Sequence, residues 1–197
     1  MTSKSGKAKG RRLQVEVAET LAIQMGLTIE AAPPTKPGER ANGAVYVLEG
    51  ENPDLRVRQM GQAGADVALL SERAQEIVTL PGRPPIWWEA KNTEGWRLDA
   101  AFWRAHDLPA VALKAIQQAY VACRKDKNDG SRGYLATPVV VLGKNNHEPM
   151  ALWQAQREEI ECLMDHGTIT LMGPAWAMCR FDKFVRLLQE LRMRGDA

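Results

Sequence analysis

Two carboxylates and a lysine near the middle of the chain are of the residue types that build a small metal site. Glu89 and Lys91 belong to residues 86–91, a run of large and β-branched side chains that follows the Pro/Gly-rich residues 80–85. Such a run behind a turn-forming cluster predicts a short strand. Because side chains alternate along a strand, Glu89 and Lys91 share one face of it. The strand would therefore present a carboxylate and an ammonium side by side.

A second carboxylate, Asp66, opens another apolar run at residues 66–70, directly after a glycine-rich turn at 61–64. If the two runs are neighbouring strands, the carboxylates of Asp66 and Glu89 converge. Two such carboxylates, completed by a backbone carbonyl and water, are what Mg²⁺ accepts, because this hard cation keeps part of its hydration shell. The alternative is that Glu89 and Lys91 form only a structural ion pair at a strand end.

Hydrophobic periodicity predicts the elements that must position these groups. Residues 13–25 carry apolar side chains at helical spacing and end at Gly26, and residues 111–124 predict a second helix. On that second helix the expected buried stripe is Leu113, Ile116, Tyr120 and Cys123. Residues 139–142 are a continuous β-branched run, typical of a strand buried on both faces. The face of residues 86–91 opposite Glu89 is apolar and suits a core.

The rest of the chain adds short strands and one more helix. We expect strands at residues 44–48 and 55–58, a turn after residue 143, a polar stretch over 154–166 and a strand pair over 168–172 and 176–181. A last helix follows, capped by Asp182. Its expected buried stripe is Phe184, Leu187, Leu188 and Leu191.

Together these elements predict an α/β (α+β) fold with a central mixed β-sheet flanked by helices. A chain of 197 residues with 45% hydrophobic content is long enough to bury one sizeable core. We therefore expect a single domain over residues 13–197, preceded by a basic N-terminal tail over residues 1–12.

The positive charge is concentrated at the N-terminus, although the net charge is only +2. Five cations precede the first acid, Glu16; they are Lys4, Lys7, Lys9, Arg11 and Arg12. One interpretation is a solvated tail, and the other is a contact with nucleic-acid phosphates. Arg56 and Arg58, which share a strand face, have the same two interpretations.

Several classes of protein are disfavoured by composition. No apolar run approaches the length of a membrane span, and the first residues lack the apolar core of a signal peptide. The three cysteines are odd in number and widely spaced, which indicates neither a disulfide framework nor a zinc knuckle. We therefore expect a cytoplasmic protein, located in the host cytoplasm if it is encoded by a phage.

The order and spacing of five segments resemble a known family. The segments are residues 9–14, 60–66, 88–92, 118–119 and 138–146. Asp66 followed by Glu89-Ala90-Lys91 resembles the signature of the PD-(D/E)xK nucleases, with Gly-Ala-Asp in place of the leading Pro-Asp. The pattern is nearest to phage-borne, Holliday-junction-resolvase-like members, and it extends from about residue 9 to about residue 153. The resemblance implies a restriction-endonuclease-like core.

The resemblance also implies roles for individual residues. Asp66 and Glu89 would bind Mg²⁺, with Mn²⁺ as a substitute, and the ion would lower the pKa of a bound water and neutralise charge on the scissile phosphate. Lys91 would orient or deprotonate that water, or stabilise the developing negative charge. Related nucleases often carry a glutamate on the first helix, and that position falls here on Gln14. Glu16 lies about 200° away around the helix and is expected to be a solvated charge.

Further expectations concern polar and aromatic side chains around this centre. Gln118 matches a polar position near the catalytic lysine, although an ordinary surface glutamine fits equally. Trp96 and Trp103 could stack on unpaired bases or belong to the core. The expected DNA-binding residues are Lys7, Lys9, Arg11, Arg12, Arg56, Arg58, Asn92 and Lys144. A homodimer is implied because resolvases cut two strands symmetrically.

The resulting hypothesis is a Mg²⁺-dependent DNA endonuclease that acts on branched DNA such as a Holliday junction. The alternative is a non-catalytic DNA-binding or packaging accessory protein with the same fold. The presence of Gln14 where a glutamate is expected keeps this alternative open. An enzyme of small-molecule metabolism has no phosphate-cradling glycine loop or nucleophile motif to support it.

Overall fold

Segments far apart in the sequence form one mixed β-sheet. The computed structural model describes residues 3–30, 45–47, 51–58, 64–92, 110–125, 136–144, 147–164, 170–171 and 176–195. The strands are β1 (Thr28–Glu30), β2 (Val45–Tyr46), β3 (Leu55–Val57), β4 (Val67–Leu69), β5 (Ile86–Asn92), β6 (Thr137–Lys144), β7 (His147–Gln154), β8 (Thr170–Leu171) and β9 (Trp176–Arg180). The helices are α1 (Ser3–Met25), α2 (Glu72–Ile77), α4 (Ala110–Lys125), α5 (Arg157–Met164) and α6 (Phe181–Gly195).

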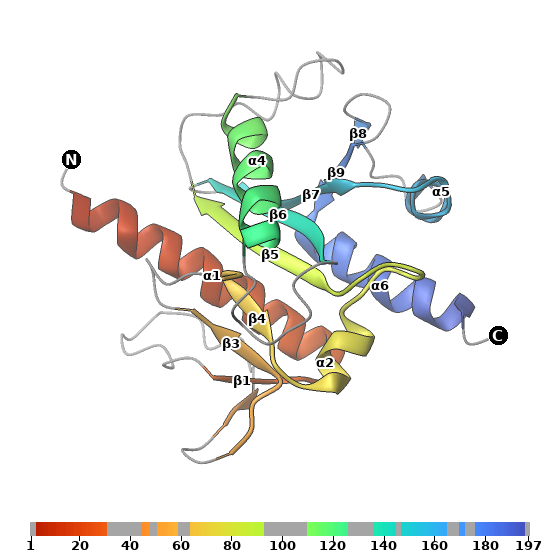
Figure 1. Ribbon diagram of the computed structural model, residues 1–197, viewed down its shortest axis with the longest axis horizontal. Helices are drawn as coiled ribbons and strands as arrows, with labels where there is room; N and C mark the ends of the chain where they lie inside the picture. The colour runs from red at the N-terminus through yellow and green to blue at the C-terminus, as the bar shows by residue number, and fades with distance from the viewer. Residues whose placement is uncertain are drawn as a thin grey trace.

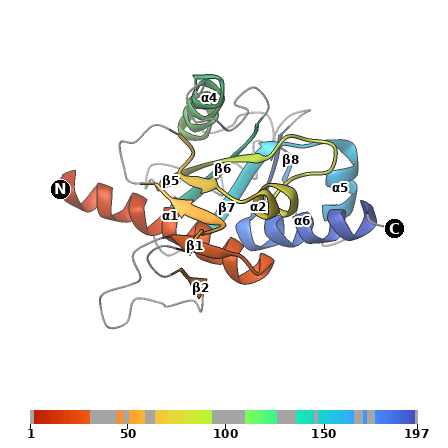
Figure 2. The ribbon, with the colours of Figure 1, turned by 60° about the horizontal axis from the view of Figure 1, so that its bottom comes forward.

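The strand order is β2-β1-β3-β4-β5-β6-β7-β9-β8 (Figure 1). β5 runs parallel to β6, and β1 runs parallel to β2 and β3, whereas the other neighbouring pairs are antiparallel. Helices lie on both faces of the sheet: Figure 2 shows α4 on one side and α1 with α6 on the other. The predicted α+β class, with one mixed sheet flanked by helices, is confirmed.

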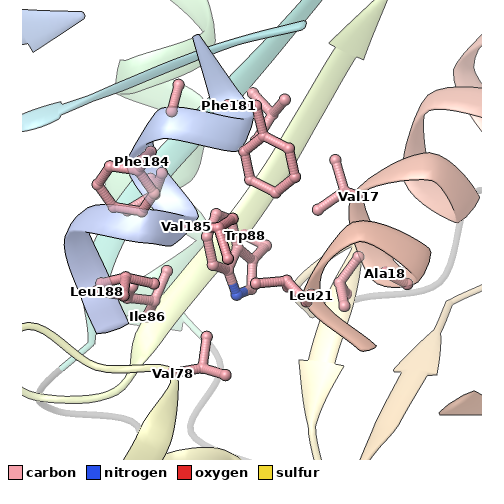
Figure 3. Packing of buried hydrophobic residues seen from close by; sticks show 14 of the residues in the cluster. Val17, Ala18, Leu21, Val78, Ile86, Trp88, Phe181, Phe184, Val185 and Leu188 are labelled. Atoms are coloured by element: carbon pink, nitrogen blue, oxygen red, sulfur yellow. The ribbon is translucent and has the colours of Figure 1, made fainter. Parts of the chain in front are cut away.

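The core between the sheet and α1 and α6 is built around Trp88 of β5 (Figure 3). Its indole makes edge contacts with Phe181 and Phe184, at centroid distances of 5.7 and 6.0 Å. Val17 and Leu21 of α1 belong to the same cluster. Aromatic pairs in this geometry add about 0.5–1.5 kcal/mol each beyond the area they bury. The predicted apolar face of residues 86–91 is therefore confirmed as a core face.

β6 is buried on both faces, as its β-branched run predicts. Val139 and Val141 pack toward α1 and α6, whereas Val140 and Leu142 pack toward α4. The expected stripe of α4 is wrong in part, because the helix buries Ala112, Ala115, Ile116 and Ala119 and leaves Leu113 44% exposed. Small alanines let α4 approach the sheet closely beside Trp87, so volume rather than hydrophobicity selects the buried face.

α1 begins earlier than the sequence predicts. Residues 3–12, expected as a tail, form its first turns, although they contain two glycines and lack an apolar stripe. Local propensity therefore argues against a helix there. Hydrogen bonds to β3 and β5 are made from the later residues of this segment, by the side chain of Arg11 and the carbonyl of Lys9. The predicted end is confirmed, because Gly26 has a φ of 65°, a backbone conformation that favours glycine.

The C-terminal part contains two elements that the sequence did not predict. β7 starts at His147 and pairs with β6 and β9, where we expected the chain to leave the sheet. α5 occupies part of the predicted polar stretch. The strand pair β8–β9 is confirmed, as is the buried stripe of α6. Asp182 lies in the first turn of α6 rather than at its cap, and it pairs with Arg180.

Candidate metal and nucleic-acid site

Asp66 is hydrogen-bonded to the neighbouring strand, β5, through both its backbone and its side chain. Its backbone N–H donates to the carbonyl of Trp88 at 2.8 Å, and its Oδ2 accepts a hydrogen bond from the backbone N–H of Ala90 at 2.7 Å. β4 and β5 are neighbouring strands, which is the condition under which we expected the two carboxylates to converge, and they are antiparallel. The carboxylate of Asp66 is therefore held directly against the Glu89-Ala90-Lys91 segment.

The turn before Asp66 requires glycine at position 64. Gly64 has a φ of +112°, and a Cβ there would lie 2.1 Å from Nη1 of Arg58. Any side chain would therefore be strained and would collide with a guanidinium. This glycine lets Arg58, at the end of β3, lie close to the segment that leads into Asp66.

Gln14 of α1 completes the support of Asp66. Its Nε2 donates to Oδ1 of Asp66 at 2.7 Å, and the side chain is only 4% exposed. Its Oε1 is buried and has no hydrogen-bond partner. An unpaired buried acceptor costs about 1–3 kcal/mol, so this oxygen is suited to a ligand that supplies a donor or a positive charge. The predicted register, with Gln14 on the buried side of the helix, is confirmed.

Glu89 and Lys91 lie on one face of β5 and form an ion pair of 2.5 Å between Oε1 and Nζ. Glu89 is buried, whereas the side chain of Lys91 is 37% exposed. The Lys91 ammonium is thus paired with the Glu89 carboxylate and remains accessible to solvent.

The pKa of Asp66 is shifted by burial and by the groups around its carboxylate. Burial and, to a smaller extent, the charge of Glu89 raise the pKa of Asp66 to about 6. The Ala90 N–H, the Lys91 ammonium and the Gln14 amide oppose the rise in the pKa. Two carboxylates that repel each other in a partly desolvated space are stabilised by a cation between them.

The donor set fits Mg²⁺. Asp66 and Glu89 supply carboxylate oxygens, and the amide of Gln14, which is bonded to Asp66, carries a buried neutral oxygen. Within the described ranges there is no cluster of three or more His, Cys, Asp or Glu side chains that could hold a metal. A cation here would therefore need carbonyl or water oxygens besides the two carboxylates, as the sequence already led us to expect.

Two of the residues predicted to bind DNA make contacts inside the fold. Arg11 donates from Nη1 to the carbonyls of Arg58 at 2.7 Å and Val57 at 3.3 Å, and burial lowers the pKa of its guanidinium. Asn92 donates from Nδ2 to the carbonyl of Lys9 at 3.4 Å. These bonds join α1 to the ends of β3 and β5. No sequence signal predicts them, because the partners are 46 to 83 positions apart.

The other predicted DNA-binding residues differ in exposure. Arg12 is exposed on α1, and Lys9, Arg58 and Lys144 are half-buried. Arg56 forms an ion pair with Glu30 at 2.6 Å, with both side chains half exposed. Lys7 belongs to α1, and the position of its side chain lies outside the description, as do Trp96 and Trp103 entirely. The assignment of these residues to DNA stays a prediction.

Gln118 has an exposed side chain, whereas Gln14 and Glu89 are buried. It lies on α4, and its side chain is exposed. The hydrogen bonds that hold Asp66 come from Gln14 and Ala90. Its interpretation as an ordinary surface glutamine is consistent with this position.

No helix in the described part of the chain is both long enough and apolar enough to cross a bilayer. Comparison with protein-family models, with curated proteins and with solved structures finds no match.

Proposed function

We propose that the protein is a Mg²⁺-dependent DNA endonuclease with a restriction-endonuclease-like core that acts on branched DNA. One observation carries the proposal: two repelling carboxylates, Asp66 and Glu89, on adjacent strands, with the Lys91 ammonium attached to one of them. A pair of carboxylates that holds a metal ion, with a lysine beside it, can support metal-assisted phosphodiester hydrolysis.

Each group has a distinct task in this proposal. Asp66 and Glu89 would hold Mg²⁺, which when bound supplies Lewis acidity toward a phosphodiester. The Ala90 N–H and the Gln14 amide each occupy one oxygen of Asp66 and fix its orientation. Lys91, accessible to solvent, would orient an attacking water or donate to the developing negative charge on the phosphate.

The nucleic-acid partner is part of the same proposal. Arg12 is exposed on α1, the helix that bears Gln14, and Arg58 lies beside Gly64 near Asp66. Cations around a metal site favour a polyanionic substrate, because each neutralised phosphate releases a counterion. A homodimer belongs to the proposal as well, since a four-way junction is resolved by two symmetric cuts; sedimentation analysis would test it.

The test is cleavage of a four-way junction and a linear duplex, with Mg²⁺ or with EDTA. Asp66→Ala and Glu89→Ala should abolish cleavage in Mg²⁺ and leave binding to the same DNA largely intact. Glu16→Ala is the matched control, because it removes a carboxylate from α1 on the side away from Gln14, and it should cleave at the wild-type rate. Wild-type turnover by Asp66→Ala or Glu89→Ala would remove these residues from the metal site.

A second candidate function is a DNA-binding or packaging accessory without catalysis. Gln14 favours it, because a neutral amide beside Asp66 leaves the site with one carboxylate fewer than a glutamate would give. The same experiment separates the two functions. DNA binding by the wild-type protein with no cleavage in Mg²⁺ or Mn²⁺ would support the accessory function.

A further inference from the structure

α1 passes over the end of β6 at a residue that has no side chain. A Cβ on Gly143 would lie 2.9 and 3.0 Å from the two Cδ atoms of Leu13, and 3.4 Å from its Cγ. Distances below 3.0 Å do not occur for real Cβ atoms, so one partner would have to move. The φ of Gly143 is not in the left-handed region, and the glycine is therefore required by space rather than by backbone conformation.

The contact lies next to the residues that support the candidate site. Leu13 is 2% exposed and immediately precedes Gln14, the donor to Asp66. Gly143 is the register partner of Asn92, which in turn donates to the carbonyl of Lys9 on α1. The same stretch of helix is thus fixed against two adjacent parallel strands at their ends.

We propose that Gly143 is a positioning residue. Because it has no side chain, Leu13 can pack against it, and this packing places the Gln14 amide within hydrogen-bond distance of Asp66. For catalysis the inference rests on the proposed function, whereas for the position of Gln14 it stands on the packing alone. Leu13 is enclosed in the core, so it cannot rotate freely away from an added methyl group. Where the enclosed Leu13 side chain cannot yield, the backbone of α1 has to shift, and Gln14 shifts with it because the two residues are consecutive on the helix.

The expected consequence is a loss of orientation at Asp66. The hydrogen bond from Gln14 is 2.7 Å long, and a shift of several tenths of an ångström or more lengthens it toward the limit of such bonds. Misplacement of a supporting group by about 1 Å costs on the order of 10²-fold in rate. Gly143→Ala should therefore lower kcat strongly and the affinity for DNA little.

The experiment compares Gly143→Ala, Leu13→Ala and the double variant Leu13→Ala/Gly143→Ala. The Leu13→Ala change removes all three atoms that the new Cβ would meet. The first readout is the NMR signal of the Gln14 side-chain amide, assigned by its loss in Gln14→Glu, together with its rate of hydrogen exchange. The second is single-turnover cleavage. Leu188→Ala, a buried change in α6, controls for general loss of core packing.

We expect the Gln14 amide to shift and lose exchange protection in Gly143→Ala, and to return to its wild-type behaviour in the double variant. Cleavage should fall by up to about 10²-fold and recover to the level of Leu13→Ala. Leu188→Ala should leave the amide signal unchanged. If Gly143→Ala does not fold but the double variant does, the steric contact is supported by that rescue.

An unchanged Gln14 amide in Gly143→Ala would overturn the inference, as would a double variant no better than Gly143→Ala. A failure of the proposed function gives a different result. In that case the wild-type protein would not cleave DNA, while the amide comparison would still decide whether Gly143 positions Gln14.

Discussion

At the scale of single residues, Asp66 is the group on which opposing interactions meet. It accepts hydrogen bonds from Gln14 and Ala90, which favour its ionised form, while burial and the charge of Glu89 disfavour that form. The balance leaves its pKa at about 6, well above the ordinary value of 3.8. A carboxylate that is costly to ionise without a cation is a suitable ligand for one.

The raised pKa of Asp66 predicts a specific pH dependence of stability without metal. The folded state binds this proton up to about pH 6 and the unfolded chain only up to about 3.8. The stability that it contributes is therefore complete below pH 3.8 and is lost as the pH rises through 6. Relative to Asp66→Asn, the wild type should lose up to about 3 kcal/mol between pH 3.8 and 7, at about 1.36 kcal/mol per unit of pKa shift.

Urea unfolding in EDTA at several pH values measures this difference. Addition of Mg²⁺ at pH 7 should raise the stability of the wild type and leave that of Asp66→Asn nearly unchanged. A difference between the two proteins that does not vary with pH would show that the pKa of Asp66 is ordinary.

Replacement of Lys91 should abolish cleavage without weakening Mg²⁺ binding. Because a cation is not a metal ligand, Lys91→Ala should lose cleavage and keep, or slightly tighten, Mg²⁺ affinity. Lys91→Arg should not restore activity, since a guanidinium is broader and stays protonated. Calorimetric titration with Mg²⁺ beside single-turnover cleavage measures the two effects. Full activity of Lys91→Ala would reduce its 2.5 Å contact with Glu89 to a structural ion pair.

At the scale of elements, α1 both supports the site and ties strand ends together. Gln14 bonds Asp66, Arg11 bonds the carbonyls at the end of β3, and Asn92 at the end of β5 bonds the backbone of α1. The basic segment therefore contains residues of two kinds, those whose charge is used inside the fold and those exposed to solvent.

Arg11 and Arg12 test this division. Arg11→Met should destabilise the protein by about 2–3 kcal/mol, because it removes charged hydrogen bonds to partly buried carbonyls. Arg12→Met should change stability by less than about 0.5 kcal/mol. If Arg12 neutralises one phosphate, its loss should lower the salt dependence of DNA binding, log K against log salt concentration, by about 0.9.

Urea unfolding and fluorescence anisotropy of labelled DNA over a salt series measure these effects. The expected pattern is a stability effect for Arg11 and a salt-slope effect for Arg12. The reverse pattern would mean that Arg11, and not Arg12, faces the nucleic acid.

At the scale of the whole molecule, a buried ion pair joins the entrance of β5 to the C-terminal elements. Nε of Arg83 lies 3.1 Å from Oε1 of Glu159 in α5, without the alignment of a hydrogen bond, and its Nη1 donates to the carbonyl of Gln154 at 2.6 Å. Glu159 also accepts from the indole of Trp153 and the backbone of Gln156. Both charged side chains are nearly enclosed.

Removal of one partner should leave an uncompensated buried charge. We expect Arg83→Met to lower the free energy of unfolding by about 3–5 kcal/mol. Arg83→Met/Glu159→Gln should recover part of that loss, because the remaining charge is gone while the indole keeps an acceptor. Thermal and urea unfolding measure both. Stability of Arg83→Met within 1 kcal/mol of the wild type would show that the pair contributes little.

Much of the fold follows from local patterns in the sequence. The alternation in residues 86–91 predicted that the side of β5 with Ile86, Trp88 and Ala90 is a core face, and the run 139–142 predicted a strand with two buried faces. Each of these signals depends on side chains within a few residues, where periodicity and turn chemistry determine structure. β7, α5 and the first turns of α1 were missed because pairing and packing with distant segments decide them.

For the candidate site, the sequence determined which groups are available: two carboxylates, a lysine on the same strand face as one of them, and a glutamine on the buried side of a helix. Only the tertiary structure decided that the Gln14 amide reaches Asp66 across 52 positions, that Arg11 is used inside the fold, and that Gln118 is exposed. The physical reason is that a strand or helix pattern fixes the face of a side chain, whereas its partner is fixed by sheet order and by how closely the helix packs. The close packing of Leu13 against Gly143, which has no side chain, lets α1 approach the sheet, and no pattern in the neighbouring residues predicts it.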